Sequence, residues 1–430
     1  MRVAVLGGGG FRVPLIHAAL QASKVDDRID EIVLQDVSDE RLAVISAVLR
    51  DPRVRTTTSL DEAIEATEVV FSVVRVGGLD GRVHDERAAL ELGVLGQETV
   101  GAGGLSYALR AVPVVAEHAE RIAALAPDAW VVSMTNPAGI VTEVMSRVLG
   151  GRVIGVCDSP TGLVRRACAA LGIDSGAATG RLGEAMSVDY VGLNHLGWLR
   201  SLRVDGTERL PALLADPAAL ARIEEGRLFG ADLIAALGAL PNEYLYWYYA
   251  ADEALAGVQA AGRTRGEHVR TEQLHFYAAA SADPSRAAEL WHAANEERNR
   301  SYFAEIRDDE RDELDLAAGG YESIAIALVE ALFGDRPSTQ ILNVRNGSSV
   351  PALPSDAVIE LPCRVDARGA TPLPVAPPTL HQLGLMSQVK DCERAIIEAA
   401  LTGSRTAALR AFALHPLVGS LTAARALATR

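Results

Sequence analysis

Short apolar runs alternate with amphipathic segments over residues 1–160, and each run has the length of a strand rather than of a helix. The pattern predicts strands over Arg2–Leu6, Glu31–Gln35, Glu68–Val74, Trp130–Met134 and Arg152–Val156. Helices are predicted between them, for example over Val13–Ala22, Glu40–Arg50 and Ser106–Leu125. Such alternation favours a parallel sheet covered on both faces. We therefore expect residues 1–158 to form a Rossmann-like α/β domain.

The pattern changes after residue 158, where strands and helices no longer alternate regularly. Strands are predicted over Ser187–Leu193 and Ala357–Cys363, and helices over Pro284–Ala304, over Ile324–Leu332 and from Leu385 onward. The proline-rich segment 370–380 is expected to be an extended connector. Residues 159–430 are therefore expected to form an α+β domain packed on the first.

Composition and charge narrow the class of protein. The chain has 430 residues, of which 49% are hydrophobic and 23% charged, as in globular proteins. The formal net charge of −15 argues against nucleic acid and anionic membranes as partners. No stretch reaches the roughly 18 apolar residues of a membrane helix, and the first apolar run ends too early for a signal peptide. The four cysteines lack paired spacing, so a cytoplasmic protein is expected.

A glycine-rich turn follows the first predicted strand, in the sequence VLGGGGFRVPL. Gly7, Gly8 and Gly9 would let the backbone approach a pyrophosphate at a helix N-terminus. The third glycine of the G-x-G-x-x-G pattern is missing, because Arg12 occupies its place. Asp36, after the second strand, could accept from a ribose diol and repel a 2′-phosphate. The pattern predicts NAD binding, and the alternative is a structural turn beside a surface carboxylate.

Two potential metal ligands also follow predicted strands. Cys157 comes after the fifth strand in GVCDSP, and His195 comes after an apolar run in DYVGLNHLGW. A thiolate and an imidazole form half of a shell for a borderline divalent ion, which substrate oxygens would complete. The alternatives are a small buried side chain at Cys157 and a hydrogen-bonded core histidine at His195. In the aromatic segment LPNEYLYWYYA, one tyrosine could act as a base if positive charge lay nearby.

Seven motifs follow one another along the chain: GGGG near the start, RVGGLDGRVHDERAALELGVLGQETVGAGGLSYALRAVPV (75–114), TNPAGIVTE (135–143), GVCDSP (155–160), GLNHLGW (192–198), YLYWYY (244–249) and ILNVRNGSSVPALPSDAVIELPCRVD (341–366). In this order they resemble the NAD- and divalent-metal-dependent glycosidases of glycoside hydrolase family 4, particularly the 6-phospho-β-glucosidases. The resemblance covers essentially the full length of the chain.

The resemblance implies a fold, a mechanism and cofactors. The fold is α/β, an N-terminal Rossmann-like parallel sheet with a C-terminal α+β domain in a lactate/malate dehydrogenase-like arrangement. In the implied mechanism NAD⁺ takes hydride from sugar C3 and a tyrosine removes the acidified C2 proton. The aglycone then leaves C1, water adds, and the hydride returns; such enzymes are exceptions to two-carboxylate glycosidase chemistry. The implied cofactors are NAD and a divalent metal, with Mn²⁺ expected. The substrate is a small phosphorylated glycoside, and relatives suggest a homodimer or homotetramer.

The same resemblance assigns individual residues. By it, Cys157 and His195 are the metal ligands and Tyr244 is the catalytic base. The substrate-binding positions are Arg12, Arg82, Asn136, Asn194 and Arg265. Arg12 replaces a serine-containing turn that helps to hold the sugar phosphate in many relatives, and a charge-assisted pair would let it take over that role. The alternative for Arg12 is an exposed side chain at a helix start.

Two departures from the family pattern keep the substrate open. Asp158 stands where β-acting relatives usually have Asn and α-acting relatives usually have His, which bears on the anomer. The turn at Arg12 bears on the phosphate requirement. The expected activity is hydrolysis of 6-phospho-β-glucosides, and a family 4 glycosidase for an α-linked or non-phosphorylated sugar is the nearest alternative. More distant alternatives are an NAD-dependent 2-hydroxyacid dehydrogenase without a metal and a non-enzymatic NAD-sensing regulator.

Overall fold

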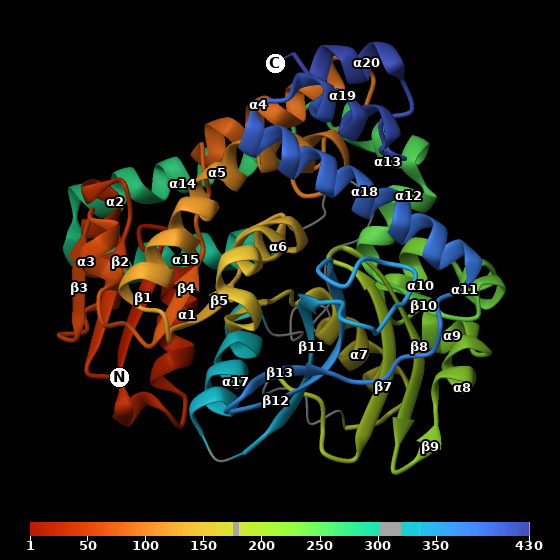
Figure 1. Ribbon diagram of the computed structural model, residues 1–430, viewed down its shortest axis with the longest axis horizontal. Helices are drawn as coiled ribbons and strands as arrows, with labels where there is room; N and C mark the ends of the chain where they lie inside the picture. The colour runs from red at the N-terminus through yellow and green to blue at the C-terminus, as the bar shows by residue number, and fades with distance from the viewer. Residues whose placement is uncertain (175–179, 301–319, 335, 430) are drawn as a thin grey trace.

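A single mixed sheet lies at the centre of the protein (Figure 1). The computed structural model describes residues 1–174, 180–300, 320–334 and 336–429. The strands are β1 (Arg2–Leu6), β2 (Glu31–Gln35), β3 (Val54–Thr57), β4 (Val69–Ser72), β5 (Trp130–Ser133), β6 (Val153–Gly155), β7 (Met186–Leu193), β8 (Leu196–Val204), β9 (Thr207–Glu208), β10 (Leu240–Pro241), β11 (Ser338–Arg345), β12 (Val358–Asp366) and β13 (Gly369–Pro372). Their order is β10-β8-β7-β12-β11-β6-β5-β4-β1-β2-β3, with β13 beside β12 and β9 beside β8.

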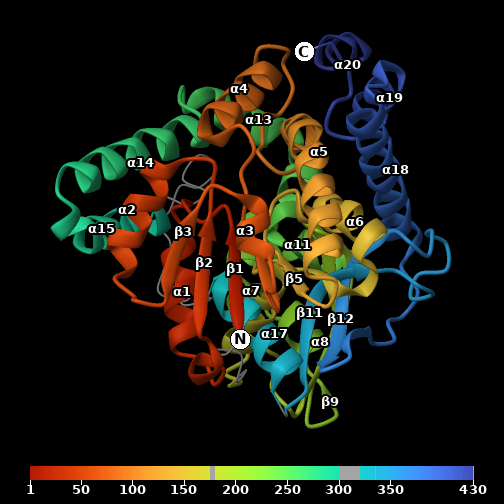
Figure 2. The same ribbon diagram turned by 60° about the vertical axis from the view of Figure 1, so that its left-hand side comes forward.

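Helices cover both faces of this sheet and extend beyond one end of it (Figures 1 and 2). The α-helices are α1 (Val13–Gln21), α2 (Asp39–Leu49), α3 (Leu60–Ile64), α4 (Gly78–Leu90), α5 (Gly101–Leu125), α6 (Ala138–Leu149), α7 (Ser159–Ala170), α8 (Leu210–Leu214), α9 (Pro217–Leu220), α10 (Glu224–Phe229), α11 (Ala231–Leu237), α12 (Tyr246–Tyr249), α13 (Ala251–Ala260), α14 (Arg265–Ala282), α15 (Ala287–Arg300), α17 (Tyr321–Phe333), α18 (Leu380–Thr402), α19 (Arg405–Leu414) and α20 (Leu421–Leu427). Short 3₁₀ turns are η1 (Asp26–Arg28), η2 (Gly150–Arg152), η4 (Glu243–Leu245) and η5 (Pro284–Arg286).

The strands from β3 to β6 are parallel and form the expected Rossmann-like half. Successive residues of β1 point to opposite faces: Val3 and Val5 join one hydrophobic cluster, whereas Ala4 and Leu6 join another. Burial on both faces explains why the strand reads as an unbroken apolar run. The predicted bounds of β1 and β2 are confirmed. The strands β4 and β6 are shorter than predicted at both ends, and β5 is shorter at its C-terminal end.

The parallel half continues into the second half of the chain through antiparallel strands. Asn343 of β11 pairs with Gly155 of β6, and Glu360 of β12 pairs with Gly192 of β7. A side chain at Gly155 would collide with the Cβ of Asn343 at 2.8 Å, so this junction requires glycine. One sheet therefore runs across residue 158, and the division of the chain into two domains there stays a prediction.

Several predicted helix bounds need correction. The helix predicted from Ser106 begins at Gly101, and the helix predicted from Leu385 begins at Leu380. The segment predicted as one helix from Pro284 starts as the turn η5 and continues as α15, while its residues 301–304 lie outside the described residues. Within the described ranges no helix is both long enough and apolar enough to cross a membrane.

Two features of the second half of the chain are a tight hairpin and a long helix. β7 and β8 are joined by a two-residue turn, Asn194–His195, because Leu193 pairs directly with Leu196. The backbone of His195 has a φ of +62°, a left-handed conformation that non-glycine residues rarely adopt. Helix α18 packs along α5, so the C-terminal helices lie over the Rossmann-like half (Figure 2).

Candidate active site

The glycine-rich turn lies against the end of β2. The backbone N–H groups of Gly7 and Gly8 both donate to the carbonyl of Gln35, at 2.8 and 2.7 Å. Gly7 has a φ of +88°, and a Cβ at Gly8 would lie 2.6 Å from the Cβ of Leu34. Close backbone contact therefore requires glycine at both positions, whatever else the turn binds.

Asp36 holds the same turn from the side. Its carboxylate accepts from the backbone N–H of Gly9 at 3.0 Å and from that of Ser38 at 3.2 Å. The carbonyl of Gly9 in turn accepts from the hydroxyl of Tyr277 at 2.6 Å. The structure thus brings Gly7, Gly8, Gly9 and Asp36 together, and Asp36 has a structural role in addition to any contact with a ribose.

His195 is buried in a setting suited to a ligand atom. Only 1% of its surface is exposed, and neither ring nitrogen has a hydrogen-bond partner among the described residues. Its ring stacks on Tyr244, with centroids 3.6 Å apart and planes inclined by 3°. Burial lowers the pKa of His195 to about 3, against the raising effect of the Glu98 carboxylate. The imidazole is therefore neutral, which is the form that binds metals.

Cys157 follows β6 and precedes α7, and its side chain is buried. Burial raises the pKa of this thiol well above its usual value, and the carboxylates of Glu360 and Asp158 raise it further. A thiol in such surroundings stays protonated unless a cation compensates the thiolate charge. The other cysteines in the described residues are also buried, but Cys157 stands at the carboxyl ends of the parallel strands.

Glu360 connects Cys157 with the hairpin turn, and sequence reasoning did not select it. Its buried carboxylate accepts from Tyr190 and Asn343, each at 2.9 Å, and from Asn194 at 3.5 Å. Burial raises the pKa of Glu360 to about 7, although these hydrogen bonds act in the opposite direction. The sequence feature that could have identified Glu360 is its position as a carboxylate in the middle of the apolar segment VIELPC.

Arg82 is part of a buried ion-pair network around Glu98. The guanidinium of Arg82 lies 2.8 Å from Glu98 and 2.7 Å from Glu86, and Arg75 lies 3.0 Å from Glu98. Burial acts to raise the pKa of Glu98, but Arg82, Arg75 and Arg298 together hold it at about 2. The Glu98 carboxylate also acts to raise the pKa of His195. This network therefore borders the His195–Tyr244 pair.

Arg12 and Arg265 lie in the same region, around Arg298. Desolvation lowers the pKa of Arg298, and the like charges of Arg12, Arg265 and Arg82 add to this effect, with Glu98 opposing it. The guanidinium of Arg265 also donates to the backbone carbonyl of Arg298 at 3.1 Å. The structure thus gathers the three predicted arginines and adds Arg298, which no sequence motif indicated.

Asn136 ends the loop after β5, close to the hairpin turn. Its side-chain oxygen is buried without a hydrogen-bond partner in the part of the chain that the structure describes. Three residues further on, a Cβ built at Gly139 would lie 3.5 Å from the Cβ of Asn194. The segments that carry the two predicted amides therefore pack against each other.

A buried charge network includes Glu243, the residue that precedes Tyr244. The preceding residue, Glu243, lies 3.5 Å from the guanidinium of Arg166 on α7, which also binds Glu225 at 3.0 Å. Burial raises the pKa of Glu243 to about 7, and Arg166 partly offsets this. Because α7 begins two residues after Cys157, this network connects the Tyr244 turn to the Cys157 segment.

The donor set suits a metal only in part. The described residues contain no group of three or more His, Cys, Asp or Glu side chains that could hold an ion. The neutral His195 imidazole, whose two nitrogens have no partner in the described residues, and the buried Cys157 thiol are donor types that fit a borderline divalent ion. Oxygen atoms of a substrate would have to complete the shell.

The fold and the polar rim at its strand ends define a dehydrogenase-like α/β protein. A malate dehydrogenase from Cryptosporidium parvum shares this fold, with a TM-score of 0.50 and 12% identity over 93% of this chain and 99% of that chain. The expected lactate/malate dehydrogenase-like arrangement is confirmed.

Family models assign the chain to a specific group. The model described as family 4 glycosyl hydrolase matches residues 2–173, and that of the family 4 glycosyl hydrolase C-terminal domain matches residues 190–418. The chain belongs to the family 4 glycosyl hydrolases, as the motif order indicated.

Relatives within the family differ in their substrates. A 6-phospho-beta-glucosidase of Escherichia coli is 29% identical over 98% of this chain and 92% of its own length. A 6-phospho-alpha-glucosidase of Leptotrichia buccalis is 27% identical over 99% of this chain and 95% of its own length. The solved 6-phospho-beta glucosidase of Thermotoga maritima, with manganese, NAD⁺ and glucose-6-phosphate, has a TM-score of 0.81 and 27% identity over 100% of this chain and 97% of that chain.

Proposed function

We propose that this protein is an NAD- and divalent-metal-dependent glycosidase that hydrolyses 6-phospho-β-glucosides. The observation that carries the proposal is the stacked His195–Tyr244 pair, whose imidazole nitrogens have no partner in the described residues. A base and a metal ligand in contact are what the removal of a proton from a metal-bound sugar requires. A dehydrogenase that only transfers hydride has no need of this pair.

Cys157 and His195 are the proposed metal ligands. Both are buried, and both adjoin the Glu360–Asn194 contact, Cys157 through the carboxylate and His195 through the chain. When bound, Mn²⁺ supplies Lewis-acid polarisation of sugar oxygens, and NAD⁺ supplies the hydride acceptor. The glycine turn Gly7–Gly9 and Asp36 would hold the dinucleotide at the carboxyl end of β1.

Tyr244 is the proposed base for the C2 proton of the sugar. Its ring is fixed by the stack on His195 and by the hydrogen bond from its backbone N–H to the side chain of Asn242 at 3.0 Å. A metal ion held by His195 would place positive charge near the phenol of Tyr244. Positive charge there would favour the phenolate, which is the form that acts as a base. Asn136 and Asn194 would orient sugar hydroxyls, because an amide can both donate and accept.

The arginine cluster is the proposed binding site for the sugar phosphate. Arg12, Arg265 and Arg298 lie close enough to disfavour one another's charge, as the lowered pKa of Arg298 indicates, with desolvation as the larger cause. A phosphate dianion would offset that repulsion and accept charge-assisted hydrogen bonds. Arg82 already pairs with Glu86 and Glu98, so its contribution is to hold the cluster in place as well as to contact substrate.

A substrate panel tests the proposal. Chromogenic glucosides with α or β linkage, with or without a 6-phosphate, are assayed with NAD⁺ and Mn²⁺. We expect turnover of the 6-phospho-β-glucoside without stoichiometric NADH. Turnover of the α-linked or free glucoside instead would favour the nearest alternative, to which Asp158 and the α-acting relatives give weight. NADH formed in equal amount with an oxidised product would favour a dehydrogenase.

We also infer a small phosphorylated glycoside as the substrate, no nucleic-acid or membrane partner, a cytoplasmic location, and a homodimer or homotetramer. The net charge of −15 supports a role away from nucleic acids and anionic membranes. Light scattering of the purified protein with NAD⁺ measures the oligomeric state.

A further inference from the structure

A cavity of about 460 Å³ lies far from the candidate active site, at the opposite end of α1. Lys24, Val25 and Arg28 line it from the segment after α1, and Glu330 and Phe333 line it from the end of α17. Arg12, in the arginine cluster, precedes α1, whereas Lys24 follows it. Nine helical residues span about 13 Å, so the cavity and the cluster are separate.

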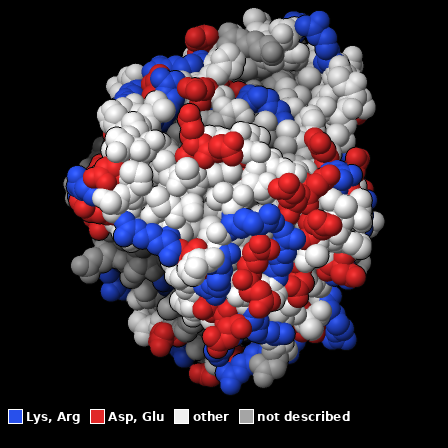
Figure 3. Space-filling view, turned by 90° about the vertical axis from the view of Figure 1, so that its left-hand side faces the viewer, with Lys and Arg blue, Asp and Glu red and all other residues white. Residues whose placement is uncertain are grey.

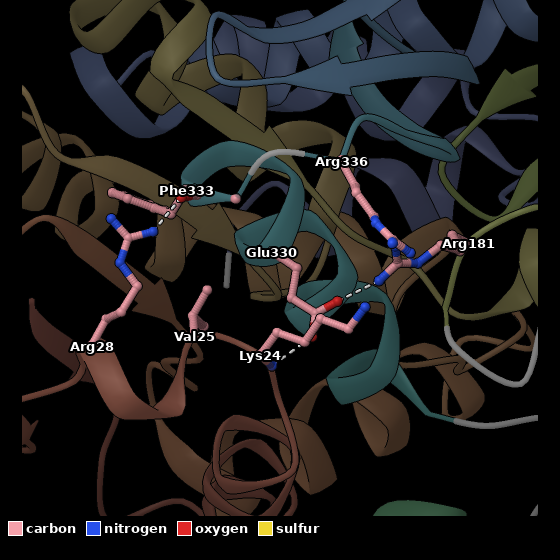
Figure 4. A pocket seen from close by; sticks show the side chains of 8 residues that line it. Lys24, Val25, Arg28, Arg181, Glu330, Phe333 and Arg336 are labelled. Carbon is pink, nitrogen blue, oxygen red and sulfur yellow. Dashed lines mark hydrogen bonds and ion pairs between the residues drawn. The ribbon is translucent and has the colours of Figure 1, made fainter.

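Four cationic side chains line this cavity, which we call the α1–α17 pocket: Lys24, Arg28, Arg181 and Arg336. Among the described residues that line the pocket, only Glu330 carries a carboxylate. Figure 4 shows Lys24, Arg181 and Arg336 around Glu330 on one side, with Arg28 beside Phe333 on the other. In a chain with a net charge of −15, such a local excess of positive charge calls for an explanation.

Local structure explains two of the four cations. Arg28 donates to the backbone carbonyl of Phe333, where the negative end of the α17 dipole favours a cation. Arg181 pairs with Glu330. The other oxygen of Glu330 accepts from the backbone N–H of Lys24 at 2.9 Å, so both oxygens of this carboxylate are occupied.

Lys24 and Arg336 have no counter-charge among the residues that the structure describes. In the described ranges the ammonium of Lys24 and the guanidinium of Arg336 have no hydrogen-bond acceptor or ion-pair partner on the protein. Basic and acidic side chains are interspersed over much of the face that Figure 3 shows. Unpaired cations that converge on one cavity repel one another, and an anion between them would relieve this repulsion.

We propose that the α1–α17 pocket binds a phosphate-bearing small molecule, either free phosphate or a phosphate ester, at a site distinct from the catalytic one. The planar guanidinium groups of Arg181 and Arg336 match phosphate oxygens, and Lys24 supplies a point charge. The cavity volume falls within the ~300–1,000 Å³ of small-molecule sites, which leaves room for a sugar or nucleoside attached to the phosphate. The pocket does not depend on the proposed glycosidase activity.

Titration calorimetry at fixed ionic strength tests the pocket, with inorganic phosphate and glucose 6-phosphate as probes. The variant Lys24→Ala/Arg336→Ala removes the two unpaired cations. The control Arg405→Ala/Arg425→Ala removes two exposed arginines elsewhere, so the net charge changes equally. We expect the pocket variant to lose one of two binding events per chain, or at least tenfold in its affinity, while the control keeps both.

The two probes identify the source of the anion. Loss with both probes assigns the site to the phosphate group, and loss with glucose 6-phosphate alone assigns it to an ester. Equal weakening in the pocket variant and the control, or a wild-type protein whose binding of both probes is unchanged in the pocket variant, would overturn the proposal. A single wild-type event that the pocket variant loses would support the pocket and count instead against phosphate binding at the arginine cluster. Turnover of the pocket variant in phosphate-free buffer should equal that of the wild type.

A measurement without substitutions guards against a misfolded variant. Crystals of the wild-type protein are soaked with tungstate, an oxyanion that scatters X-rays strongly. We expect a tungsten peak between Lys24 and Arg336. A saturating soak that leaves the pocket empty would overturn the proposal.

Discussion

The phenol ring of Tyr244 lies flat against the imidazole of His195, with centroids 3.6 Å apart and planes inclined by 3°. These residues are far apart in sequence, one in a hairpin turn and the other in a 3₁₀ turn. The stack fixes the orientation of both rings, and the unusual backbone of His195, with a φ of +62°, directs its side chain into the contact. The arrangement gives a geometric basis for a base beside a metal ligand.

Replacement of Tyr244 by Phe should abolish most turnover while the fold is retained. The ring and its stack on His195 remain, and only the proposed proton acceptor is lost. We expect kcat to fall by about 10²–10⁴-fold with little change in melting temperature. Steady-state kinetics and thermal unfolding measure the two effects. Wild-type turnover in Tyr244→Phe would assign the base to another residue.

Removal of metal should inactivate the protein reversibly. We expect EDTA and thiol oxidants to abolish activity, and Mn²⁺ with a reductant to restore it. Cys157→Ser should weaken Mn²⁺ binding by at least about tenfold, because a hydroxyl is a poorer ligand than a thiolate. Cys168→Ser, at another buried cysteine, is the control and should bind Mn²⁺ normally. Full activity after complete removal of metal would refute the ligand assignment.

Asp36 should select NAD⁺ over NADP⁺. Asp36→Asn removes the charge that would repel a 2′-phosphate and weakens acceptance from the ribose. We expect NAD⁺ affinity to fall about tenfold, equivalent to about 1.4 kcal/mol, and the preference over NADP⁺ to decrease. Fluorescence titration measures both, with Asp39→Asn as a control of equal charge. Unchanged selectivity would leave Asp36 with only its structural role, the hydrogen bond from Gly9.

Asp51 should make stability depend on pH in the acid range. Hydrogen bonds from Arg53 hold the pKa of Asp51 well below its usual value, and burial acts against them. Because the folded-state pKa is depressed, this stabilisation is present above about pH 4 and is lost as the pH falls further. Asp51→Asn should lower the free energy of unfolding by about 1–3 kcal/mol near pH 7.

The difference between wild type and Asp51→Asn should narrow as the pH decreases. Urea unfolding of both proteins at about pH 7, 5 and 3 measures it, and the common titration of other carboxylates cancels in the comparison. A difference that stays constant to about pH 3 would contradict the account of Asp51.

The sequence predicted the Rossmann-like half well because both faces of its strands are buried. β1 and β2 are unbroken apolar runs, and their bounds match the prediction. The edge strand β3, Val54–Thr57, was missed because it is mostly polar and buries little. The start of α5 was missed because glycine disfavours helices. Gly103 nevertheless lies within the helix. The position requires glycine, because a Cβ there would lie 2.0 Å from the carbonyl oxygen of Gln97.

The candidate site was predictable only where motifs marked it. The order of motifs selected Cys157, His195 and Tyr244, and the structure places Tyr244 against His195. Glu360 and Arg298 were missed because their importance depends on tertiary contacts: the first accepts from side chains on three segments, and the second gathers arginines from distant helices. No local pattern encodes such contacts.

Solvent deuterium incorporation tests the central claim, that hydrolysis passes through removal of the sugar's C2 proton. The reaction is run in D₂O with a 6-phospho-β-glucoside, NAD⁺ and Mn²⁺, and the product is analysed by NMR and mass spectrometry. The account predicts deuterium at C2 of the released sugar phosphate. A hydrolysed product that retains hydrogen at C2, with Tyr244→Phe as active as the wild type, would contradict it.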